Sequence, residues 1–283
     1  MYGAIEAGGT KFNLAVCDES LNIIHQKQIP TTTPEETMAG VFEFFEKYPV
    51  EKMGIGSFGP IGVVKGSDEY GHILNTPKTA WKNFPFLQAM EEKFPVPTAW
   101  TTDVNAAAYG ELKKGAAQGK KSCLYLTIGT GIGGGLVLDE QVFHGASHPE
   151  MGHIFIKRDP ADTYKGTCPY HHDCLEGLAA GPSIEARTHI KGQNLPADHP
   201  VWDLQAYYLA QALVNYTLMV PVEKIVLGGG VMNQDHLLGK IRQSFLKQMN
   251  HYVEIENIDD YIVRWGLPNQ SGIIGALLLA ADL

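Results

Sequence analysis

Short apolar runs separated by polar turns recur along the whole chain. Apolar residues predominate in Tyr2–Ala7, Phe12–Cys17 and Leu21–His25, and the turns between these runs predict a β-meander. Later runs of the same character predict further strands at Lys52–Ser57, Thr98–Thr101, Leu124–Ile128, Leu136–Leu138 and Lys224–Leu227.

Between these runs, apolar residues recur with helical spacing. Thr33 suits the N-cap of a helix, Pro34 suits its first position, and Glu36 completes a T-x-x-E capping box. The apolar face of this helix consists of Met38, Val41, Phe42 and Phe45. Further helices are predicted at Phe86–Lys93, Ala106–Lys114, around Leu204–Tyr216, at Asp235–Met249 and at the apolar C-terminus. This alternation predicts an α/β fold.

The opening pattern returns near the middle of the chain. Leu124–Ile128 is followed by a glycine turn, a second apolar run and an Asp-Glu turn, as at the N-terminus. At one constant offset, Gly8 matches Gly129 and Asp18 matches Asp139. Two such copies predict a duplicated α/β architecture with a cleft between the halves, although two unrelated hairpins would give the same pattern.

Composition excludes several classes of protein. The 283 residues suggest about two domains, and 22 Lys+Arg against 31 Asp+Glu give a net charge of −9. This acidity argues against a general nucleic-acid surface, no apolar stretch reaches the length of a membrane span, and no secretory signal is visible. Four cysteines do not make a disulfide scaffold at this length. We therefore expect a cytoplasmic protein that binds neither nucleic acid nor membranes.

Glycine is in excess, with 31 residues, or about 11% of the chain against an average near 7%. Three glycine-rich turns follow apolar strands: AGGTKF, IGTGIGGG and LGGGVM. Backbone N–H groups in such turns can point at phosphate oxygens, and Thr10, Lys11 and Thr130 add hydroxyls and a cation. None has the Walker A spacing, and the G-x-G-x-x-G arrangement lacks its ribose-binding acid. Together the turns predict a nucleotide clamped between two domains.

Cysteines and histidines gather in the segment 150–176. Cys168, His171 and Cys174 follow the spacing C-x2-H-x2-C, and His153 lies upstream within reach of the same loop. Two thiolates and two imidazoles suit tetrahedral zinc, and four protein ligands leave no open position. The pattern therefore predicts a structural zinc site that holds a loop in place.

Alternatives to this site stay open. His172 is the rival ligand to His171, and surface histidines with free thiols are the alternative to any metal. Cys17 and Cys123 lie within predicted strands, where we expect them to be plain core residues.

Three acidic residues are candidates for proton transfer or hydroxyl binding. Asp103 follows a strand and precedes a helix, where α/β proteins place ligands and where a carboxylate can accept a hydroxyl proton. A helix N-cap is the alternative for Asp103. Glu150 and Glu176 flank the cysteine-rich loop and can accept hydroxyl protons from a polyol, or be solvated surface acids.

The motifs AGGTK, DVNAAA, TIGTGIGGG, ExGH, the cysteine-rich loop and LGGGVMN occur in that order. In combination they make the chain resemble the ROK (repressor, open reading frame, kinase) family of sugar kinases over almost its whole length, and within it the zinc-containing bacterial fructokinases. The resemblance implies the actin-like ATPase (ribonuclease H-like) fold, with ATP and sugar in a cleft between two duplicated α/β domains. We expect a smaller domain over residues 1–118, a larger one with the zinc loop over 119–270, and a C-terminal helix, about 271–283, that packs back on the first.

The resemblance also implies roles for the candidate residues. Asp103 resembles the catalytic base that takes the proton of the sugar C6 hydroxyl as this hydroxyl attacks the γ-phosphate. The matching sugar-binding positions are Asn75, Asp103, Glu150, His153 and Glu176, and the matching zinc ligands are His153, Cys168, His171 and Cys174. The matching ATP-binding positions are Gly8, Gly9, Thr10, Lys11, Gly129, Thr130, Gly131, Gly133, Pro182, Gly228, Gly229, Gly230, Val231, Met232 and Asn233. Mg²⁺ would bridge the ATP phosphates, with Glu6 as an indirect contact.

Three departures from the family pattern bear on the substrate. Glu6 stands where many members have Asp, and Thr102 stands where glucokinase-like members often have Asn. The C-x2-H-x2-C loop replaces the C-x-C-x4-C of many relatives and is similar to the fructokinase branch. We therefore expect D-fructose to be converted to fructose 6-phosphate.

Two alternative functions remain. A sibling kinase would act on mannose, glucose or an N-acetylhexosamine. A sugar-sensing regulator without catalysis is the alternative from another class, but family repressors carry a helix-turn-helix before the first phosphate loop. Here AGGTK begins at Ala7, which leaves no room for one. A homodimer is common in similar proteins and is expected.

Overall fold

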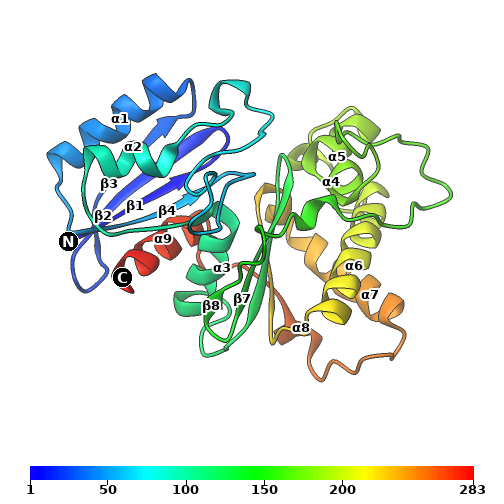
Figure 1. Cartoon of the computed structure of the whole chain (residues 1–283). Helices are drawn as coiled ribbons and strands as arrows, with labels where there is room; N and C mark the ends of the chain where they lie inside the picture. Colours follow the sequence, from blue (N-terminus) through cyan, green and yellow to red (C-terminus); the bar gives the residue numbers. More distant parts are fainter. The chain divides into compact units, whose positions relative to one another are not determined.

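The computed structural model describes all residues from Met1 to Leu283 and contains two five-stranded sheets (Figure 1). The first sheet has the order β3-β2-β1-β4-β5. β1 is antiparallel to β2 and parallel to β4, while β2 is antiparallel to β3 and β4 parallel to β5. Its strands are β1 (Tyr2–Ala7), β2 (Lys11–Cys17), β3 (Ile23–Pro30), β4 (Lys52–Ser57) and β5 (Thr98–Thr102).

The second sheet repeats the first. Its order, β10-β9-β6-β7-β8, places β6 in the centre as β1 is placed in the first sheet. β6 is parallel to β9, β9 is parallel to β10, and β7 is antiparallel to β8, which are the directions of the matching pairs. The strands are β6 (Cys123–Ile128), β7 (Ile132–Leu138), β8 (Gln141–Val142), β9 (Ile225–Gly228) and β10 (Ile262–Arg264). The predicted duplicated α/β architecture is confirmed.

The chain divides into two compact units. The first comprises residues 1–119, 135–149 and 266–283, and the second comprises 120–134 and 150–265. The segment 135–149 thus groups with the first unit, whereas the sequence-based division assigns it to the larger domain. No helix in either unit combines the length and the apolar composition that a membrane crossing requires.

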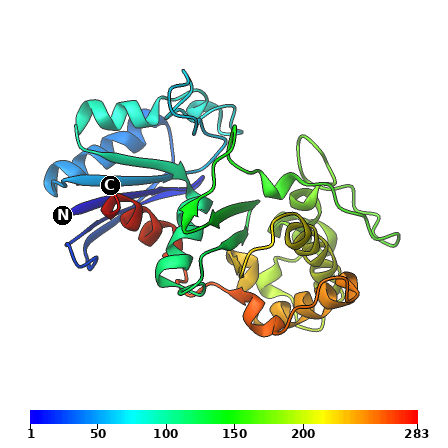
Figure 2. The same cartoon turned by 60° about the horizontal axis from the view of Figure 1, so that its bottom comes forward.

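Helices cover both faces of the first sheet. α1 (Pro34–Lys47) and α2 (Phe86–Lys93) bury large apolar side chains on one face, around Phe12, Phe45 and Phe86. On the other face, α3 (Asp103–Lys114) and α9 (Ser271–Ala281) pack on small residues such as Ala4 and Ala15. Both views show α9, in red, lying along this sheet (Figures 1 and 2). The sheet is therefore the middle of three layers.

A buried carboxylate joins α9 to α3. Glu111, which has no exposed surface, accepts hydrogen bonds from the backbone nitrogens of Ala116 (2.8 Å), Gly266 (2.8 Å) and Leu267 (3.0 Å). It also accepts one from Ser271 Oγ at 2.6 Å. Because every donor is fixed by the turn that carries it, these bonds hold the start of α9 against the end of α3.

The second unit is mainly helical outside its sheet. Its long helices α6 (Val201–Met219) and α7 (Asp235–Met249) pack against each other. Short helices α4 (Leu175–Ala179) and α5 (Gly181–Thr188) follow the cysteine-rich loop, and α8 (Ile258–Tyr261) precedes β10. Short 3₁₀ turns complete the chain: η1 (Thr79–Trp81), η2 (Met151–His153), η3 (Gly192–Asn194) and η4 (Gly230–Asn233).

Several element bounds differ from the sequence predictions. The third strand begins at Ile23 rather than Leu21, because Leu21 has a φ of 64° inside a turn that Asp18 holds by accepting from the Asn22 nitrogen. Helix α3 begins at Asp103 rather than Ala106. Strand β7 begins at Ile132, so three glycines assigned to the second turn, at 133–135, lie within the strand.

Candidate functional site

One edge of the first sheet carries two of the predicted features. Ala7 pairs with Ser57, and Ser57 pairs with Thr102, so the carboxyl ends of the parallel strands β1, β4 and β5 are level. The first glycine turn follows β1 and Asp103 follows β5, which places both at the edge where α/β sheets bind ligands.

Asp103 is the first residue of α3. Thr102, and not Asp103, is the N-cap, because its hydroxyl accepts the hydrogen bond from the Asn105 nitrogen at 3.1 Å. One carboxylate oxygen of Asp103, Oδ1, accepts from the Val104 nitrogen at 2.9 Å. The N-cap alternative for Asp103 is therefore wrong, and its carboxylate lies in the first turn of α3, at the positive end of the helix dipole.

Residues that sequence reasoning missed hold this helix end in place. The amide of Asn105 is completely buried, donates to Thr101 Oγ1 at 3.3 Å and accepts from the Leu136 nitrogen of β7 at 3.1 Å. A Cβ on Gly135 would collide with the Val104 carbonyl, so glycine permits this close approach of strand and helix. The only sequence signal is a polar residue among the alanines of DVNAAA.

The first glycine turn is closed by its own backbone and by a threonine. The Gly8 nitrogen donates to the Lys11 carbonyl at 3.0 Å, and Thr31 Oγ1 donates to the Gly8 carbonyl at 2.8 Å. The Lys11 side chain is exposed, and Gly9 and Thr10 form the bend between β1 and β2. Thr31 gave no signal in the sequence, because its contact depends on the position of the end of β3.

Glu6 lies on β1 directly before this turn. Its Oε2 accepts a hydrogen bond from Asn13 Nδ2 at 2.7 Å. Burial raises the pKa of Glu6 above its usual range, although the bond from Asn13 and the charge of Lys11 oppose the rise. Asn75, the other candidate in this unit, is exposed in the loop between β4 and η1.

The second and third glycine turns lie together in the second unit. The Gly181 nitrogen, at the start of α5, donates to the Gly129 carbonyl at 2.7 Å, and the Gly129 nitrogen donates to the Gly131 carbonyl at 2.9 Å. Gly229 has a φ of 87°, and a Cβ there would collide with the backbone at Ile128. The structure thus gathers the predicted Gly129–Gly131 turn, the segment Gly228–Asn233 and Pro182 of α5 at one edge of the second sheet.

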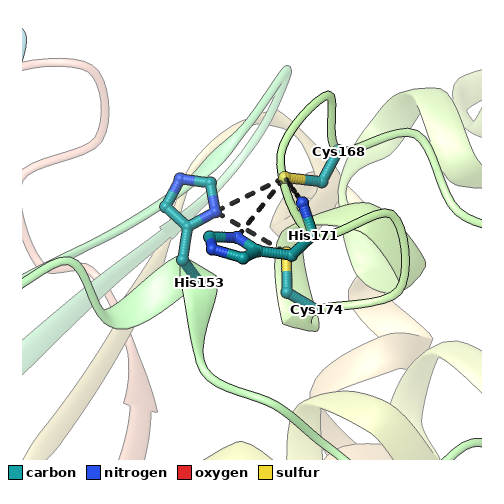
Figure 3. Close-up of side chains that lie close together, drawn as sticks. All are labelled: His153, Cys168, His171 and Cys174. Atoms are coloured by element: carbon teal, nitrogen blue, oxygen red, sulfur yellow. Dashed lines mark hydrogen bonds between the residues drawn. The ribbon is translucent and has the colours of Figure 1, made fainter. Parts of the chain in front are cut away.

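The four predicted metal ligands come together in the same unit (Figure 3). One nitrogen or sulfur from each of His153, Cys168, His171 and Cys174 lies within 4.8 Å of all the others. His153 Nδ1 is 3.6 Å from both Cys168 Sγ and Cys174 Sγ, and His171 Nδ1 is 3.8 Å from Cys168 Sγ. His171, rather than His172, faces the cluster. Cys17 and Cys123 are fully buried in strands, as predicted for core residues.

Two carboxyl groups, those of Glu150 and Glu176, lie near His153 of this cluster. His153 Nε2, on the far side of the ring from the cysteines, lies 3.9 Å from Glu176 Oε1. Burial raises the pKa of the Cys174 thiol to about 11, and the neighbouring Cys168 adds to the rise. Burial also raises the pKa of Glu150, against the lowering effect of His153 and together with the nearby Glu176.

Known proteins match the chain over nearly its full length. The fructokinase of Pediococcus pentosaceus is 49% identical over 280 residues, covering 99% of this chain and 97% of that protein. The fructokinase of Streptococcus mutans is 46% identical over 289 residues, covering 100% and 98%. The solved structure of the ROK hexokinase from Thermus thermophilus, at 26% identity, has a TM-score of 0.81 and covers 99% of this chain and 97% of that one.

The repeated strand order of the two sheets and the structural match over nearly the full chain define an α/β protein of the actin-like ATPase fold. The signature of the ROK family spans residues 2–283, and the chain belongs to that family.

Proposed function

We propose that this protein is a sugar kinase that transfers the γ-phosphoryl group of ATP to O6 of D-fructose. The observation that carries the proposal is the carboxylate of Asp103 at the positive end of α3, on the same sheet edge as the first glycine turn. The fructokinases that match the whole chain at 46–49% identity support fructose as the substrate.

In this reaction Asp103 accepts the proton of the C6 hydroxyl. The oxygen of that hydroxyl forms a bond to the γ-phosphorus as the bond between this phosphorus and the bridging oxygen of ADP breaks. The products are fructose 6-phosphate and ADP, and the proton remains on Asp103 until it passes to solvent. Phosphoryl transfer depends mainly on positioning and charge neutralisation, and Mg²⁺ bound with ATP would supply the charge neutralisation.

The remaining candidates bind the two substrates in this proposal. The ATP phosphates are held by the turns at Gly8–Lys11 and Gly129–Gly131 and by Gly133. The adenosine is held by Pro182 and the segment Gly228–Asn233. The sugar hydroxyls form hydrogen bonds with Asn75, Glu150, His153 and Glu176. Glu6 would contact the magnesium ion indirectly. We further propose, on the resemblance to the family, a cytoplasmic homodimer.

The cysteine-histidine cluster fits zinc. For Zn–S near 2.3 Å and Zn–N near 2.0 Å, a tetrahedron places sulfur and nitrogen ligands about 3.5 Å apart. The distances from His153 Nδ1 to the two sulfurs are both 3.6 Å, close to that value. Two thiolates would balance the charge of the ion, which would hold the cysteine-rich loop against α4. We propose that these four residues bind a structural zinc ion.

The substrate is tested with a panel of hexoses. With saturating ATP, we expect kcat/KM to be highest for fructose and at least tenfold lower for mannose, glucose and N-acetylglucosamine, because hydroxyl-binding sites discriminate strongly between hydroxyl patterns. The Asp103→Asn variant, purified in parallel, measures any contaminating host kinase. If another hexose has a higher kcat/KM, that hexose and not fructose is the preferred substrate. If no hexose is phosphorylated, the proposed function is wrong.

A further inference from the structure

The Glu176 side chain lies between the cysteine-histidine cluster and the second glycine turn. Its Oε1 lies 3.9 Å from His153 Nε2, and its Oε2 accepts a hydrogen bond from the Ile132 nitrogen at 2.9 Å. A Cβ on Gly131 would lie only 2.6 Å from the same Oε2, so glycine lets the carboxylate lie directly against the turn. One side chain therefore contacts both features.

The backbone provides the second half of this connection. Cys174 is the N-cap of α4, and Glu176 lies in the first turn of that five-residue helix. A group that fixes Cys174 also fixes the start of α4 and with it the origin of the Glu176 side chain. A histidine whose Nδ1 faces the metal ligands and whose Nε2 faces a carboxylate is the arrangement by which outer carboxylates orient metal-bound histidines.

The glycine turn depends on such external anchors. Gly129 and Gly131 have no side chains to restrict them, and glycine loses more conformational freedom on ordering than any other residue. Two hydrogen bonds to the α4–α5 segment hold this turn. The Glu176 carboxylate accepts one from the Ile132 nitrogen, and the Gly181 nitrogen donates one to the Gly129 carbonyl. Loss of one anchor leaves the turn less ordered before a phosphate binds, which weakens binding.

We propose that metal bound to the cysteine-histidine cluster orders the Gly129–Ile132 turn through Glu176, so that metal loading sets the affinity of the protein for ATP. The nucleotide part of this inference rests on the proposed function. Glu176 acts here as a positioning residue, and its lone pairs leave it able to accept a sugar hydroxyl as well.

The test uses the full-length protein in four forms: metal-loaded parent, chelator-treated parent, Glu176→Gln and Glu176→Ala. Amide hydrogen exchange over residues 129–134 and the Kd for ATP with magnesium, measured without sugar, are compared. We expect chelation to speed exchange in the turn and to raise the Kd roughly tenfold, the scale of one charge-assisted hydrogen bond. Glu176→Ala should show both effects with its metal retained, and chelation should then change it little further. In Glu176→Gln, which keeps an oxygen for the Ile132 nitrogen, we expect a smaller change.

Two controls make the result specific. Glu185→Gln, the same change at an exposed position of α5, should leave exchange and Kd at the parent values. Amide exchange in α7 reports whether chelation unfolds the whole second unit. If it does, the metal-loaded Glu176→Ala variant still tests whether Glu176 orders the turn. Unchanged exchange in the turn of metal-loaded Glu176→Ala would overturn the proposal. If the parent binds no ATP at all, the proposed function fails, while the exchange data still decide whether metal and turn are linked.

Discussion

Replacing Asp103 by asparagine should lower kcat for fructose phosphorylation by roughly 10²–10⁴, the usual scale for the loss of a general base. Asparagine has nearly the same shape and can still accept the hydrogen bond from the Val104 nitrogen at the start of α3, so the helix should form as before. What the variant loses is the ability to take the proton of the attacking hydroxyl. Steady-state kinetics give kcat, and titration calorimetry should show that ATP still binds.

A matched control exists in the same chain. Asp203 also lies in the first turn of a helix, α6, and its carboxylate is exposed in an ion pair with Lys240. Asp203→Asn should therefore keep the parent kcat within about twofold, since surface changes of this kind have small effects. A parent-like kcat for Asp103→Asn would mean that another group accepts the proton.

Replacing Cys174 by serine should abolish zinc binding and destabilise the protein. Cys174 is completely buried, and its sulfur is part of the set of four ligands that lie within 4.8 Å. If zinc is present at a thousandfold excess over its Kd, its loss lowers the apparent unfolding free energy by about 4 kcal/mol, or roughly 10 °C in Tm. Metal content is measured by mass spectrometry, and Tm by scanning calorimetry.

Cys17→Ser is the control for this change. Cys17 is also completely buried, but it lies on β2 in the first unit. Its substitution will itself reduce Tm, because a hydroxyl replaces a buried thiol, yet it should leave one zinc per chain. Metal well below one per chain in the parent protein, or undiminished metal in Cys174→Ser, would contradict the zinc assignment.

Elements with local signals were the most predictable. Helix α1 begins as predicted because Thr33 and Pro34 act through contacts within a single turn, and Thr33 Oγ1 does accept from the Glu36 nitrogen. The bounds of α2 and α7 match the prediction because their apolar spacing is regular. The duplication was predictable from the match of Gly8 with Gly129, since each glycine belongs to the turn that follows the central strand of its sheet, whereas the strand order within the sheets was not predicted.

Features that depend on tertiary contact were not predictable. The run of glycines at 133–135 resembles a turn in sequence, yet it forms part of β7. Glycine is needed there for close packing, because a Cβ on Gly134 would collide with Met151 and a Cβ on Gly135 with the Val104 backbone at the start of α3. The grouping of His153, Cys168, His171 and Cys174 was predictable from their spacing in the sequence. By contrast, the hydrogen bonds that the Ile132 nitrogen donates to Glu176 and the Leu136 nitrogen donates to Asn105 join residues far apart in the sequence, and no local pattern marks them.

The most direct test of the account is the identity of the product. Purified protein is incubated with ATP, magnesium and fructose labelled with ¹³C at C6, and the reaction is followed by ¹³C and ³¹P NMR. We predict one fructose 6-phosphate for each ADP, with phosphorus coupling on the labelled carbon. A phosphate ester at another carbon, or ADP formed without a sugar ester, would contradict the proposed transfer to O6.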